Sequence, residues 1–136
     1  MKLSDFDFRI WDGKKYINNV KGGVYIHKIN DYIKCLKRNQ DCYDYEFELD
    51  DLDNSNLEIE LFTGLYDKKD KKVYENDIVK VKSLYDYFLA KISIHKEGTF
   101  YFEGKNGDYI GPLIYLVEDE GYTIETIGNI HENGSY

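Results

Sequence analysis

The sequence predicts a mainly β protein with at most one short helix. Apolar and polar residues alternate with a period of two in several segments, which is the pattern of half-buried strands. Turn-forming Gly, Asn and Asp separate these segments at short intervals, and only one segment has apolar residues at helical spacing. Short strands at this spacing favour a barrel or a sandwich over units in which strands and helices alternate.

The first predicted strands lie in the N-terminal part of the chain. Residues 6–11 contain alternating apolar and polar side chains, and Asp12-Gly13 is a turn signal that predicts a β-hairpin into Tyr16-Ile17. Gly22-Gly23 then interrupts the chain before residues 24–26, a short β-branched and aromatic run that predicts another strand.

The one helical segment follows this strand. Asn30 or Asp31 can cap a short helix, because both side chains accept hydrogen bonds from free backbone N–H groups. Tyr32, Ile33 and Leu36 would then share one face of that helix.

Two further strands are predicted to have one apolar and one acidic face. Apolar and acidic side chains alternate in residues 43–50, and residues 57–61 repeat the pattern. Residues 41–60 carry nine acidic side chains and no basic ones, so their charge of −9 slightly exceeds the net charge of −8 of the whole chain. The acidic side chains predicted to face outward and to be candidates for binding a partner are Asp44, Glu46, Glu48, Asp50, Glu58 and Glu60.

The C-terminal half continues as short strands and turns. Predicted strands occupy residues 78–81, 88–94, 100–102, 109–117 and 123–130. Pro112 has no N–H to donate, which predicts an edge or irregular strand around it. The predicted core residues are Phe8, Trp11, Leu61, Ile78, Val79, Val81, Ile92, Ile127 and Ile130.

Three segments resemble the YopX-like family of phage and prophage proteins. Residues 62–81 read FTGLYDKKDKKVYENDIVKV, which is similar to the family pattern YTGLxDKNGKxIYEGDIV without a gap. FRIWD at residues 8–12 and TIGNIHEN at residues 126–133 resemble the family's FRxWD and VIGNIYEN. The resemblance implies an SH3-like β-barrel core with additional N-terminal strands, and it implies no reaction.

The chain departs from this pattern at two glycines. Lys69-Asp70 stands where Asn-Gly is usual, and Asn76 stands where Gly is usual. Asn and Asp adopt the left-handed region more readily than most residues, so Asn76 is a suitable replacement. The charged residues of this block are predicted to shape turns.

Length and composition predict one domain in the cytoplasm. The 136 residues suit a single domain, with the barrel core mainly at 57–131 and N-terminal strands from 1–50 packing on it. No apolar run approaches the ~20 residues that span a bilayer, and the N-terminus lacks the apolar segment of a secretory signal. Cys35 and Cys42 form no C-x-x-C unit and are expected to be reduced thiols.

No catalytic or metal-binding signature is present, so the chain is predicted not to be an enzyme and to need no cofactor. A calcium loop starting at Asp51 would need Gly and Glu where the chain has Asn56 and Phe62. The three histidines have no metal-ligand spacing, and no serine lies in a G-x-S-x-G elbow.

The predicted function is therefore that of a phage or prophage accessory protein that binds a host or phage protein. The acidic face would attract a positively charged partner, although a solvated surface is the simpler interpretation of that face. Weak nucleic-acid binding is the alternative, because tyrosines and lysines lie together at Tyr66, Lys68, Lys69, Lys71, Lys72 and Tyr74. The sequence pI of 4.9 argues against it. Self-association through a β edge is a further possibility.

Overall fold

The computed structural model describes residues 1–17, 23–38, 49–51 and 56–133. The described chain is mainly β, as predicted, and it divides into two compact units. Unit 1 comprises Met1–Phe8 and Glu60–Tyr136, and unit 2 comprises Arg9–Ile59. The strands are β1 (Phe8–Trp11), β2 (Val24–Ile29), β3 (Tyr32–Arg38), β4 (Leu49–Asp51), β5 (Glu58–Tyr66), β6 (Lys72–Tyr74), β7 (Asp77–Lys82), β8 (Tyr87–Ile94), β9 (Phe100–Glu103), β10 (Tyr109–Pro112) and β11 (Thr123–Asn129).

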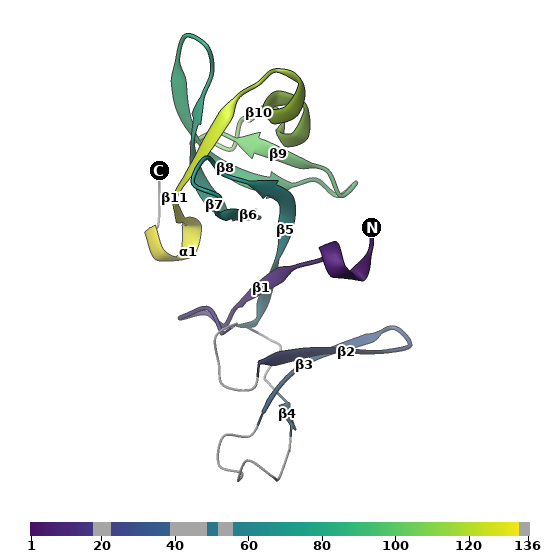
Figure 1. Ribbon diagram of the computed structural model, residues 1–136. Helices are drawn as coiled ribbons and strands as arrows, with labels where there is room; N and C mark the ends of the chain where they lie inside the picture. The colour runs from purple at the N-terminus through teal and green to yellow at the C-terminus, as the bar shows by residue number, and fades with distance from the viewer. Residues whose placement is uncertain (18–22, 39–48, 52–55, 134–136) are drawn as a thin grey trace. The chain divides into compact units, whose positions relative to one another are not determined.

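A five-stranded antiparallel sheet forms the centre of unit 1 (Figure 1). Its strand order is β10-β9-β8-β7-β11, so β7 to β10 are sequential neighbours and β11 returns to pair with β7. Pro112 ends β10 at the edge of this sheet, as predicted, because an edge position needs no N–H from proline on its outer side. A π-helix (Tyr115–Asp119) follows β10.

One face of this sheet is the core of unit 1. In β7, Val79 and Val81 are buried while Lys80 and Lys82 are exposed, as the period-two alternation requires. The buried cluster is Val73, Val79, Val81, Ala90, Ile92, Phe102, Leu113 and Ile124.

The structure confirms four of the predicted core residues and corrects another. Ile78, Val79, Val81 and Ile92 are at most 2% exposed. Ile127 is 46% exposed, so its assignment to the core is wrong. The remaining predicted core residues, Phe8, Trp11, Leu61 and Ile130, are partly buried.

A β-bulge explains the exposure of Ile127. Thr126 pairs with Val79, and Gly128 pairs with the next residue of β7, Ile78. Ile127 is therefore the extra residue of β11, and the extra residue of a bulge breaks the alternation of faces.

Two conservative substitutions on β11 should separate these environments. Ile124→Val should lower the free energy of unfolding by about 0.5–1.5 kcal/mol, because it removes a methylene group from a core side chain that is 2% exposed. Ile127→Val should change it by less than about 0.5 kcal/mol. Urea unfolding measures both, and equal losses would contradict the bulge assignment.

Unit 2 contains two turns, of which the sequence predicted the first and not the second. The predicted hairpin after β1 is present, because Trp11 bridges Tyr16 and the Ile17 N–H donates to the Ile10 carbonyl at 3.1 Å. The Asp12 Oδ1 atom accepts two backbone N–H groups in this turn, each at 2.8 Å.

The helix predicted after residue 30 is wrong. Residues 32–38 form β3, which pairs antiparallel with β2. Ile29 pairs with Tyr32, so Asn30 and Asp31 form a two-residue hairpin turn, and Asn30 has a φ of 51°. Asn is one of the few residues that favour this conformation, so its turn chemistry prevails over its capacity to cap a helix.

The strands described form open sheets of five and three strands that are not closed into a barrel. The SH3-like barrel implied by the family resemblance is therefore not confirmed. Helical structure in the described ranges is short: a 3-10 helix (Leu3–Asp5), the π-helix and α1 (Ile130–Asn133). In the part of the chain that the structure describes, no helix has the length and apolar character to cross a membrane.

Candidate functional site

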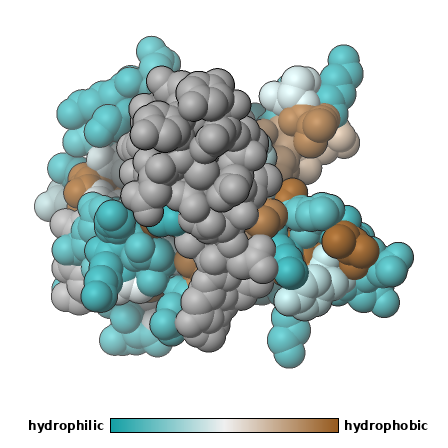
Figure 2. Space-filling model, turned by 90° about the horizontal axis from the view of Figure 1, so that it is seen from below, coloured by the Kyte–Doolittle hydropathy of each residue, from teal (hydrophilic) through white to brown (hydrophobic). Residues whose placement is uncertain are grey.

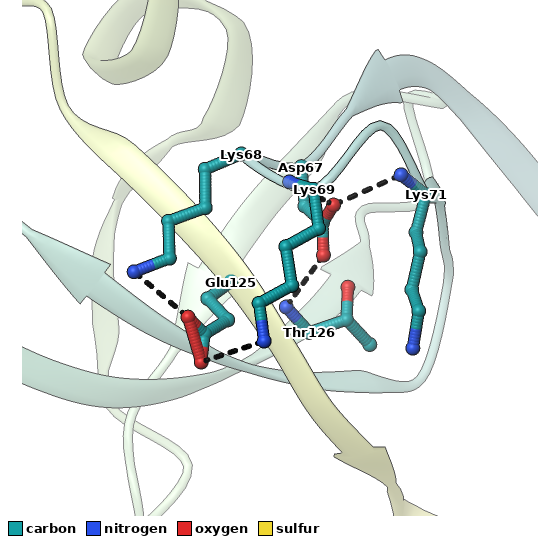
Figure 3. Close-up of polar contacts among 6 residues, drawn as sticks. All are labelled: Asp67, Lys68, Lys69, Lys71, Glu125 and Thr126. Carbon is teal, nitrogen blue, oxygen red and sulfur yellow. Dashed lines mark hydrogen bonds and ion pairs between the residues drawn. The ribbon is translucent and has the colours of Figure 1, made fainter.

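The turn between β5 and β6 is built around the buried carboxylate of Asp67, which is 5% exposed (Figure 3). Its Oδ1 atom accepts the backbone N–H groups of Lys69 and Lys71, both at 2.9 Å. Its Oδ2 atom accepts the Thr126 N–H of β11 at 3.0 Å. Asp70, which stands in the position of the family's glycine, has a φ of 62°. The signature block therefore shapes a turn, as predicted.

These hydrogen bonds determine the charge state of Asp67. Burial alone would raise the pKa of this carboxyl group, because it disfavours the charged form. The N–H groups of Thr126, Lys71 and Lys69 outweigh that effect, and the pKa lies below its usual value of 3.8. Asp67 is thus a negative charge whose hydrogen bonds fix the turn and connect it to β11.

Two lysines of this turn reach a glutamate on β11. The Lys68 Nζ atom lies 2.8 Å from Glu125 Oε2, and the Lys69 Nζ atom lies 4.0 Å from Glu125 Oε1. Figure 3 shows both side chains extending to Glu125, whereas Lys71 points away from it. The Lys68 N–H also donates to the Ile124 carbonyl at 2.9 Å, which fixes the turn against β11.

Two more lysines lie on β7, the strand that pairs with β11. Lys80 pairs with Glu125 across the strands, and Lys82 pairs with Thr123. The Lys80 Nζ atom lies 4.4 Å from the centre of the exposed Tyr87 ring, within the range of a cation–π contact. A pocket of about 100 Å³ lies here, lined by Lys68, Lys80, Lys82, Thr123, Ile124 and Glu125. We call Lys68, Lys69, Lys80 and Lys82 the lysine cluster.

Glu125 is the negative group at the centre of the lysine cluster. The hydrogen bond from Lys68 and the positive charges of Lys68, Lys69 and Lys80 lower the pKa of its carboxyl group. One carboxylate against four ammonium groups leaves the cluster with an excess of positive charge. This surface can therefore bind an anionic group.

The structure separates the residues of the predicted nucleic-acid surface. Lys72 and Tyr74 bond the Oδ2 atom of Asp7 instead, at 2.8 and 2.6 Å. The pKa of Asp7 is lowered, because the hydrogen bonds from Lys72 and Tyr74 outweigh the opposing effect of burial. Tyr66 is 55% exposed at the end of β5. Lys68 and Lys69 alone of the predicted set join the lysine cluster.

Most of the predicted acidic face lies outside the residues that the structure describes. Asp44, Glu46 and Glu48 belong to that part of the chain, and Asp50 is described only through its backbone pairing with Lys37 in β3 and β4. Their role in binding a partner stays a prediction. On β5, Glu58 is exposed as expected.

Glu60 is not on an outer face: its side chain is 0% exposed, so that part of the prediction is wrong. The Asn76 Nδ2 group donates to Glu60 Oε2 at 2.7 Å, and the His131 Nε2 atom lies 2.8 Å from the same oxygen. Ile59, predicted to be on the apolar face, is 48% exposed instead. Asn76 and His131, which lie far from Glu60 in the sequence, supply polar partners for its buried side chain. The buried and exposed faces of β5 are therefore the reverse of those that alternation predicts at these two positions.

The sequence analysis did not identify Lys80, Lys82 and Glu125 as parts of this site. Lys80 and Lys82 alternate with valines, so their outward orientation was predictable from the pattern. Their proximity to Glu125 was not, because the pairing of β7 with β11 joins residues more than 40 positions apart.

The fold and the lysine cluster define a small, mainly β protein with a cationic surface cluster. Its relatives agree with this fold. A sequence model described as YopX protein matches residues 7–135, and the chain belongs to the YopX protein family. A comparison with the curated proteins found no match.

Two solved structures are similar to the chain over almost its whole length. The crystal structure of protein YopX from Bacillus subtilis has 19% identity and a TM-score of 0.63, covering 93% of this chain and 94% of its own. Protein EF1440 from Enterococcus faecalis has 22% identity and a TM-score of 0.55, covering 95% of each chain. At these identities the likeness shows the fold alone.

Proposed function

We propose that this chain is a non-catalytic phage or prophage accessory protein that binds an acidic segment of another protein through the lysine cluster. The observation that carries the proposal is the gathering of four lysines around Glu125. Lys68 and Lys69 pair with its carboxylate, Lys80 acts on it through its charge, and Lys82 lines the same pocket. This local positive excess stands on a chain whose net charge is −8. A surface of opposite sign to the whole molecule can orient a partner of matching charge.

Nucleic acid is the less favoured partner of this surface. Proteins that recognise double-stranded DNA usually have a strongly basic face and arginines that contact base edges. This chain has a pI of 4.9 and two arginines, Arg9 and Arg38. Tyr87 is 59% exposed beside Lys80. Because unpaired bases can stack on an exposed aromatic ring, single-stranded nucleic acid is the second candidate partner.

Neutralising the β7 lysines should weaken capture of an acidic protein. Exposed charge pairs contribute about 0.2–1 kcal/mol each, so the double variant Lys80→Gln, Lys82→Gln should lose about tenfold in affinity at low salt. The measurement is retention of proteins from nuclease-treated bacterial lysate on the immobilised chain, followed by binding of the purified partner.

The matched control is the double variant Lys96→Gln, Lys105→Gln, which changes the net charge equally at two exposed positions of unit 1. It should bind the partner as the unmodified chain does. Equal capture by both double variants would contradict the proposal. A partner that is captured from untreated lysate but not from nuclease-treated lysate would favour the nucleic-acid alternative.

A further inference from the structure

The pocket inside the lysine cluster is large enough for a small anionic group. Its volume of about 100 Å³ exceeds the roughly 30 Å³ that one water molecule occupies in the liquid. A phosphate or carboxylate group fits such a space.

The charge of the lining favours a dianion. Lys68, Lys80 and Lys82 contribute three ammonium groups, and Glu125 contributes one carboxylate. The lining therefore has an excess of two positive charges. A phosphate monoester carries about −1.5 to −2 at pH 7, whereas each diester of a nucleic acid backbone carries −1.

The lining residues come from three segments of the fold. Lys80 and Lys82 project from the same face of β7, Lys68 reaches over β11 from the turn, and Thr123 lies opposite Lys82. The Asp67 hydrogen bonds hold the turn that positions Lys68. The donors thus belong to two paired strands and a fixed turn.

We propose that this pocket binds a phosphate monoester, with Lys68, Lys80 and Lys82 as its ligands and Glu125 as an internal competitor. The proposal deepens the proposed function and rests on it: the acidic partner segment would present a phosphorylated side chain here. Glu125 forms an ion pair with Lys68 when the pocket is empty, and a bound phosphate would replace Glu125 as the partner of that lysine.

The internal competitor gives the proposal a distinctive test. Lys80→Gln or Lys82→Gln should weaken binding of phosphate by about three- to tenfold, because each removes one ammonium group. Glu125→Gln should strengthen binding by a similar factor, because it removes a negative charge from the pocket. Lys105→Gln, an exposed lysine outside the pocket, should leave the affinity within twofold.

The experiment is a titration of the isolated chain followed by ¹H–¹⁵N NMR at constant ionic strength. Inorganic phosphate and phosphoserine should give saturable shifts of the amides of β7 and β11, and dimethyl phosphate should bind at least tenfold more weakly. Shifts that do not saturate, or an unchanged affinity in Glu125→Gln with its spectrum otherwise intact, would overturn the phosphate site. Equal affinity for dimethyl phosphate would overturn it too, in favour of a nucleic acid backbone.

The two proposals fail in different ways. Lysine-dependent capture of a partner without saturable phosphate binding would overturn only the phosphate site. Phosphate binding without lysine-dependent capture would overturn only the proposed protein partner.

Discussion

Glu60→Ala should lower the free energy of unfolding by about 3–5 kcal/mol. The Glu60 carboxylate is fully buried and bonds Asn76 and His131 through one oxygen. These partners come from the β6–β7 turn and from α1, so the carboxylate joins β5 to two segments far along the chain. Its removal leaves a cavity and two polar groups without this acceptor, and both effects are destabilising.

Two control variants separate the charge from the general effect of substitution. Glu60→Gln keeps the shape of the side chain and one acceptor oxygen, so it should lower the free energy of unfolding less than Glu60→Ala does. Glu132→Ala makes the same change at an exposed position of α1 and should cost less than about 0.5 kcal/mol. The measurement is equilibrium unfolding in urea at pH 7, and a Glu60→Ala loss no greater than that of Glu132→Ala would contradict the assignment.

Local patterns predicted most of the strands but not which face of β5 is buried. Polar and apolar residues alternate from 57 to 61, which places Glu60 outside by sequence alone. Its burial depends on Asn76 and His131, which lie 16 and 71 residues away. Such long-range partners are invisible to a reading based on local periodicity.

Backbone conformation explains the successes and errors at the turns. Asn76 has a φ of 69°, as its place in the family pattern predicts, and its side chain additionally bonds Glu60. Asn30 has a positive φ too, but there the same residue type was interpreted as a helix cap. Ile127 was assigned to the core because strict alternation contains no signal for a bulge.

The lysine cluster was only half predictable. Lys68 and Lys69 were candidates for nucleic-acid binding because they lie among lysines and tyrosines at residues 66–74. Lys80, Lys82 and Glu125 joined them through the pairing of β7 with β11, which no local pattern specifies. A surface cluster assembled from several segments can be recognised only once the fold is known.

Asp67→Asn should lower the free energy of unfolding by about 2–3 kcal/mol at pH 7. The carboxylate accepts three backbone N–H groups, and asparagine has the same shape but only one acceptor oxygen. The amide nitrogen of asparagine would face a backbone donor, so at least one N–H, on Thr126 or in the turn, loses its partner. The loss should also displace the turn that carries Lys68.

The difference in the free energy of unfolding between the unmodified chain and Asp67→Asn should depend on pH, and its direction follows from the lowered pKa of Asp67. The pKa of Asp67 in the folded chain is below 3.8, so the unfolded chain takes up a proton first as the pH falls. The stability that this charge contributes is complete above the unfolded pKa and is lost as the pH falls through the folded pKa. The difference between the unmodified chain and Asp67→Asn should therefore be constant from pH 7 to about 5 and shrink below pH 4. Urea unfolding at these pH values measures it, with Asp108→Asn as the control at an exposed carboxylate of unit 1. A difference that grows on acidification would show that the Asp67 charge destabilises the fold.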